Sequence, residues 1–117
     1  MTFWETKIEA WPSRDHRPIA VLRPEPGELG QKLSITFRDD RDDLDELRYA
    51  GLRLSGGDQI LLVRHRRAPR PGTEVHADAG SDGAAVLQRF LCETGVSPHE
   101  VTWQLAATGF DRQPSRE

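Results

Sequence analysis

Hydrophobic and polar side chains alternate along several stretches of the chain, as is typical of half-buried β-strands. In residues 4–11, Trp4 lies on one side of this alternation and Trp11 on the charged side. We expect Trp4 and Trp103 to fill the core. Residues 33–37 alternate in the same way, and residues 19–23 form a short apolar run. We expect these last two segments to be antiparallel neighbours, because prolines and glycines that favour a turn lie between them.

Two longer apolar stretches, residues 46–54 and 59–66, flank the sequence SGGD. A two-residue turn of two glycines predicts a β-hairpin, because such turns need positive φ angles. In that register Leu52 lies opposite Leu61. Both faces of the hairpin then carry apolar side chains, so we expect its strands to be central in a sheet that is covered on each side.

A helical pattern is convincing only in residues 81–95. Ser81 or Asp82 can cap its first turn, apolar residues follow at helical spacing, and Gly95 ends it. The segment therefore predicts an amphipathic helix that packs on the sheet.

Short strands are also expected at residues 75–78 and 101–107, the first of them paired with the second strand of the hairpin. Together these elements predict an α+β fold. It consists of an antiparallel, meander-like β-sheet of about five to six strands with one main α-helix, in the C-terminal half, packed on it. We expect a single domain over residues 1–108 and a flexible tail over residues 109–117.

Composition excludes several classes of protein. The single cysteine, Cys92, excludes an intrachain disulfide and a cysteine-cluster metal site. No apolar run approaches the roughly 18 residues of a membrane span, and the N-terminal residues lack a signal-peptide core, so a cytoplasmic location is expected. The net charge of −3 argues against a general nucleic-acid-binding protein.

An acidic run covers residues 38–46, in which six acidic residues stand against two arginines. We expect a solvated loop here, because closely spaced carboxylates repel each other. The run can form an acidic face for a basic partner, where charge mainly raises the association rate and selectivity. Trp11 is added to this surface because an exposed tryptophan beside charged residues is typical of an interface hot spot. The predicted partner-binding residues are Asp39, Asp40, Asp42, Asp43, Asp45, Glu46 and Trp11.

A basic cluster follows the second hairpin strand. Its arginines match carboxylates and phosphates, so they are the candidate ligands of a small anion such as a nucleotide or a phosphorylated metabolite. Alternatively, the arginines only keep the end of the strand soluble. They can also face the acidic run, either within one molecule or between two copies of the chain. The cluster comprises Arg64, Arg66, Arg67 and Arg70.

A third candidate site is a histidine-based enzyme or metal site. His76 and Asp78 share one face of their predicted strand, and His65 can lie on the neighbouring strand. No spaced metal-binding motif, nucleophile motif or phosphate-binding loop accompanies them.

The sequence thus favours a small, non-enzymatic protein-interaction module, of the kind seen in bacterial adaptors, inhibitors and immunity proteins. Its expected partner is another protein, which would have a basic surface if it contacts the acidic run. Association of the chain with a second copy of itself is also possible. We expect the protein to bind no cofactor, metal ion, membrane or nucleic acid. Anion binding at the arginine cluster and a histidine-based site are the alternatives.

Overall fold

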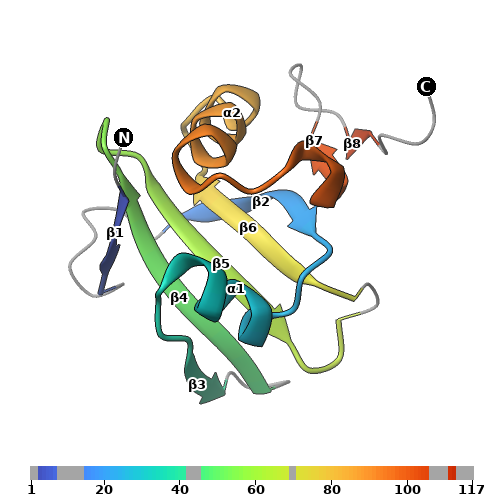
Figure 1. The fold of residues 1–117 in the computed structure, drawn as a ribbon. Helices are drawn as coiled ribbons and strands as arrows, with labels where there is room; N and C mark the ends of the chain where they lie inside the picture. The colour runs from blue at the N-terminus through green and yellow to red at the C-terminus, as the bar shows by residue number, and fades with distance from the viewer. Residues whose placement is uncertain (1–2, 8–14, 42–45, 69–70, 106–110, 113–117) are drawn as a thin grey trace.

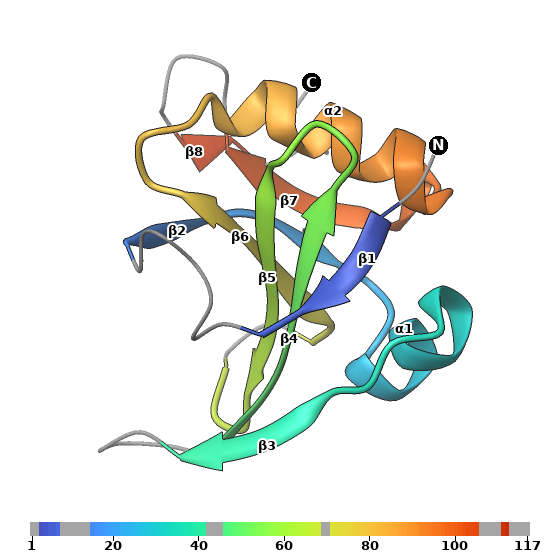
Figure 2. The same ribbon diagram turned by 90° about the vertical axis from the view of Figure 1, so that its left-hand side faces the viewer.

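A computed structural model describes residues 3–7, 15–41, 46–68, 71–105 and 111–112 of the chain. In it, one strongly twisted β-sheet carries two α-helices (Figures 1 and 2). The strands are β1 (Phe3–Thr6), β2 (His16–Leu22), β3 (Arg38–Arg41), β4 (Glu46–Leu54), β5 (Gln59–His65), β6 (Thr73–Asp78), β7 (Val101–Leu105) and β8 (Asp111–Arg112). The helices are α1 (Pro26–Leu33) and α2 (Gly83–Thr94), and a short 3-10 helix, η2 (Pro98–Glu100), precedes β7. The α+β class and the helix in the C-terminal half are confirmed, and the antiparallel sheet has more strands than expected.

The strand order is β1-β4-β5-β6-β2-β7-β8, and β3 pairs with β4. Strands β4, β5 and β6 form the expected meander, and β2 inserts between β6 and β7. Both β1 and β3 pair with β4 on the side that faces away from β5. Strand β3 therefore forms part of one edge of the sheet.

The predicted pairing of residues 19–23 with residues 33–37 is wrong. The segment between them forms helix α1 and not an open turn. Pro26 suits the first helical turn, and the N–H of Glu25 donates to the Glu28 carboxylate at 3.5 Å. Leu29 lies in the core, so the helix is held by burial in spite of its two glycines.

The β4–β5 hairpin forms, but its predicted register is wrong by one residue. The N–H of Gly57 donates to the Leu54 carbonyl, and the N–H of Leu54 donates to the Asp58 carbonyl, each at 2.9 Å. Gly57 has a φ of 100°, which is typical of a three-residue hairpin loop that ends in a left-handed residue. As a result Leu52 lies opposite Ile60, and Leu61 lies opposite Gly51.

Strands β4 and β5 are central and apolar on both faces, as predicted. One face contributes Leu52 and Leu62 to the main core, which also contains residues of both helices. The other face forms a smaller cluster in which Leu61 and Val63 are buried.

Helix α2 begins and ends as predicted. The Asp82 carboxylate accepts a hydrogen bond from the N–H of Ala85 at 3.3 Å, and Gly95 follows the last turn with a φ of 78°. Phe90 is fully buried against the sheet, whereas Cys92 is exposed.

Candidate functional site

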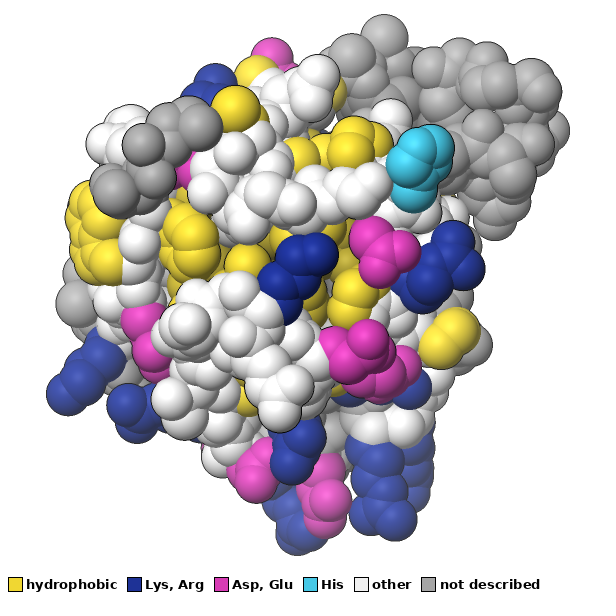
Figure 3. All heavy atoms as spheres, in the orientation of Figure 1, with side chains coloured by type: hydrophobic (Ala, Val, Ile, Leu, Met, Phe, Trp, Pro, Cys, Tyr) yellow, Lys and Arg dark blue, Asp and Glu magenta, His cyan; other side chains and the backbone are white. Residues whose placement is uncertain are grey.

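Charged side chains from β3, β4 and β5 surround an open hollow of about 650 Å³. Figure 3 shows side chains of both signs gathered at the lower end of the molecule, where β3 lies in Figure 1. We call this site the charged hollow. Its ionisable residues are Asp39, Asp40, Arg41, Glu46, Arg48, Arg64 and Arg66.

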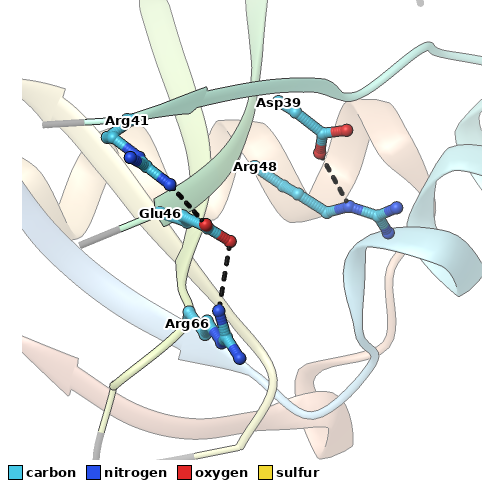
Figure 4. Close-up of polar contacts among 5 residues, drawn as sticks. All are labelled: Asp39, Arg41, Glu46, Arg48 and Arg66. Carbon is cyan, nitrogen blue, oxygen red and sulfur yellow. Dashed lines mark hydrogen bonds and ion pairs between the residues drawn. The ribbon is translucent and has the colours of Figure 1, made fainter.

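The pairing of β3 with β4 brings opposite charges together. Asp39 lies opposite Arg48, and Arg41 lies opposite Glu46. Residues directly opposite in an antiparallel pair project from the same face, so their side chains meet. Arg48 Nε lies 3.1 Å from Asp39 Oδ1, and an Arg41 guanidinium nitrogen lies 2.7 Å from Glu46 Oε2. Figure 4 shows both contacts.

Glu46 joins the turn after β5 to this ladder. Arg66 Nη1 lies 3.4 Å from Glu46 Oε1, so the carboxylate is placed between two guanidinium groups (Figure 4). The hydrogen bond from Arg41, and then the positive charge of Arg66, lower the pKa of Glu46 below its ordinary value. These side chains are largely exposed, so the ladder orients charges on the surface more than it stabilises the fold.

Arg64 connects the hollow to α1 and the β5–β6 loop. Its Nε lies 3.5 Å from Glu25 Oε1, and its Nη1 lies 3.4 Å from the Gly72 carbonyl. Glu25 in turn accepts a 2.7 Å hydrogen bond from the N–H of Gly72. Arg64 and Arg66 therefore each contact a carboxylate, and the described arginines do not form a ready anion cradle.

The acidic run and the arginine cluster, which the sequence presented as two separate sites, meet in the charged hollow. Asp39, Asp40 and Glu46 line it together with Arg64 and Arg66, as in the alternative in which the two runs face each other within one molecule. The expected solvated loop is wrong for residues 38–41, which form β3, and for Glu46, which begins β4. Arg67 lies exposed in the turn after β5. Trp11, Asp42, Asp43, Asp45 and Arg70 lie outside the described residues.

Sequence reasoning missed Arg41 and Arg48 as members of the site. Arg48 lies two residues before the buried part of β4, and no sequence motif identifies it. Its role follows only from the pairing with Asp39, which becomes visible once residues 38–41 are recognised as a strand.

Two residues that were not predicted, His16 and Glu74, contact His76 of the predicted histidine site. His76 Nδ1 lies 2.9 Å from His16 Nδ1, and His76 Nε2 lies 2.8 Å from Glu74 Oε1. His65 lies on the neighbouring strand β5, as predicted, and it also lowers the pKa of Glu74, and Asp78 lies opposite His16. Glu74 was missed, although its position two residues before His76 on one strand places both on the same face.

The environment of this histidine pair shifts two pKa values. Burial lowers the pKa of His16, the neighbouring His76 lowers it further, and Asp15 opposes both effects. The hydrogen bond from His76 lowers the pKa of Glu74. Within the described part of the chain, no group of three or more histidine, cysteine or acidic side chains is arranged to hold a metal ion.

Comparisons with known proteins give no independent guide to function. No protein-family model matches the chain, and neither a curated protein nor a solved structure is significantly similar to it. Among the described residues, no helix has the length and apolar character needed to cross a membrane.

Proposed function

We propose that this protein acts by binding another protein through the charged hollow, with β3 as the contact strand. The observation that carries the proposal is the position of β3 at the sheet edge. All four of its residues are exposed, and among the described residues it pairs only with β4. Its outer N–H and C=O groups can therefore accept a strand of the partner, which is a common mode of recognition.

The side chains around β3 give this edge its specificity. Arginines and carboxylates alternate along the ribbon and are held in place by the contacts of Asp39, Arg41 and Glu46. A partner segment of alternating charge satisfies such a surface, whereas a uniformly basic or acidic one meets like charges. Like-charge contacts are costly and exclude wrong partners.

The test is site-specific photocrosslinking in an extract of the source cells. A photoreactive phenylalanine analogue replaces Arg38 on β3, or Lys32 on α1 as the control, since both positions are exposed. We expect one crosslinked protein from position 38 and none from position 32. Crosslinks to a second copy of the chain alone, or equal products from both positions, would contradict the proposal.

The charge dependence is tested with the crosslinked partner once it is purified. Asp40→Lys should weaken binding by about tenfold, because it places a second positive charge beside Arg41, and the loss should shrink at high salt. Lys32→Glu reverses a charge outside the hollow and should leave the affinity unchanged. Binding of Asp40→Lys that equals the wild type at low salt would exclude the charged hollow as the interface.

A further inference from the structure

A second hollow, of about 460 Å³, lies over β2, β5, β6 and β7, and we call it the Trp103 groove. Its apolar lining includes Val21, Val63, Trp103 and Leu105, and its ionisable lining includes Arg17, Arg64 and Glu74. The volume falls in the range of about 300–1,000 Å³ that is typical of small-molecule sites.

Strand register explains why these side chains share one surface. Val63 lies opposite Glu74, Glu74 lies opposite Val21, and Val21 lies opposite Trp103. Opposed residues project from the same face, so the four side chains form a row across four adjacent strands. Val63 belongs to the smaller cluster, whereas Val21, Trp103 and Leu105 also belong to the main core, so the groove exposes only a small part of each side chain. The sheet itself therefore forms the floor of the groove, which is apolar apart from the carboxylate of Glu74.

Arg17 is incompletely satisfied beside this floor. Its Nη2 donates to the Ser81 carbonyl at 3.2 Å, but its buried Nε has no hydrogen-bond partner in the described structure. A buried donor without a partner is unfavourable, and such groups are often completed by a ligand or an ion. Arg17 also lines the groove, so this donor is the candidate contact for an acidic group there.

Glu74 limits the charge that the groove accepts. Its hydrogen bond from His76 lowers its pKa, so it stays negative at neutral pH. Arg64 already contacts Glu25, so Arg17 is the lining cation that remains to hold one acidic group. A doubly charged phosphate is repelled by Glu74.

We propose that the Trp103 groove binds a small amphipathic monoanion. The apolar body of the ligand lies on Trp103, Val21 and Val63, and its carboxylate or sulfonate contacts Arg17. Arg64 lines both hollows, but this proposal does not rest on protein binding at the charged hollow, and either proposal can fail without the other.

The experiment uses two probes that differ in one group. The compound 8-anilinonaphthalene-1-sulfonate carries a sulfonate on an aromatic body, and N-phenyl-1-naphthylamine is its neutral counterpart. Both fluoresce in apolar sites. We expect saturable binding of one sulfonate probe per chain, at least about fivefold tighter than the neutral probe, because of the charge-assisted contact with Arg17. In parallel, the methyl NMR resonances of Val21 and Val63 should shift as the probe is added.

Three variants separate charge recognition from damage to the fold. Arg17→Gln should abolish the preference for the sulfonate, and Glu74→Gln should tighten sulfonate binding by about threefold or more because it removes a repulsive charge. Lys32→Gln removes a distant positive charge and should have no effect. The proposal is overturned if neither valine resonance shifts, if the two probes bind alike, or if Arg17→Gln and Lys32→Gln behave alike. A partly unfolded variant also binds the sulfonate probe more strongly, so each variant is used only if its circular dichroism and melting temperature match those of the wild type.

Discussion

Gly72 is a residue at which this fold requires the absence of a side chain. Its φ is 100°, and a Cβ atom built there would lie 1.9 Å from the Leu22 carbonyl oxygen. Its N–H also donates to Glu25, so the backbone has little freedom to move away. The loop between β5 and β6 is therefore fixed against β2 and α1 at this point.

We predict that Gly72→Ala lowers the free energy of unfolding by about 2–4 kcal/mol, through backbone strain and the forced displacement of β2. Urea denaturation followed by circular dichroism measures the change. Gly56→Ala is the matched control, because a Cβ at Gly56 meets no atom within 4 Å and needs no positive φ. Equal stabilities of the two variants would show that the Leu22–Gly72 contact is not fixed.

The tryptophans show how far the burial of a single residue can be predicted from the sequence. Core filling was expected of both Trp4 and Trp103, and it is right for Trp103, which is 7% exposed. It is wrong for Trp4, which is 49% exposed on the edge strand β1. Alternation identifies the face of a strand, but whether that face is covered depends on strand order, which a single sequence does not encode locally.

At the scale of the element, patterns with a local cause were predictable. Helix α2 was found with both of its ends because Asp82 and Gly95 act within one helical turn. The β4–β5 hairpin was found as a pair, but its register was not, because the sequence SGGD suits a two-residue and a three-residue loop alike. The helix α1 was missed because Pro26 and its two glycines are typical of turns, and burial of Leu29 overrides that preference. The charged hollow could not be predicted for a similar reason, because its residues come together only when residues 38–41 form strand β3.

The histidine pair ties β2 to β6, and it predicts a pH-dependent stability. Burial and the adjacent His76 lower the pKa of His16, so the unfolded chain binds more protons than the folded chain below about pH 6.5. The stability that the pair contributes is therefore present above that pH and is lost as the pH falls. Glu74, whose pKa is also lowered, adds a further loss in the same direction only below about pH 4.5.

Thermal unfolding between pH 7.5 and pH 5 tests this linkage. The wild-type melting temperature should fall with pH, and His16→Asn should flatten the dependence because asparagine can keep a hydrogen bond without titrating. His99→Asn, on the exposed helix η2, is the control and should retain the wild-type slope. A His16→Asn slope identical to that of the wild type would assign the pH dependence to other groups.

At the scale of the whole molecule, stability and surface charge are separated in space. The main core joins residues of both helices to the sheet, whereas the ion pairs of the charged hollow lie at one end, on exposed side chains (Figures 1 and 3). Burial of apolar surface contributes most of the folding free energy, and exposed ion pairs contribute little. Substitutions in the two regions should therefore have opposite consequences for folding and for binding.

Leu62→Ala and Asp39→Asn make this contrast measurable. Leu62 is fully buried, and its truncation should lower the free energy of unfolding by about 2–5 kcal/mol. The side chain of Asp39 is 81% exposed, so its neutralisation should change that free energy by less than about 1 kcal/mol, although it breaks the contact with Arg48. In a binding assay with the crosslinked partner the order should reverse, because Asp39→Asn alters the contact surface and Leu62→Ala leaves it intact as long as the variant is folded. A large loss of stability in Asp39→Asn would mean that the β3–β4 ribbon supports the fold, and its charges could then no longer be attributed to recognition.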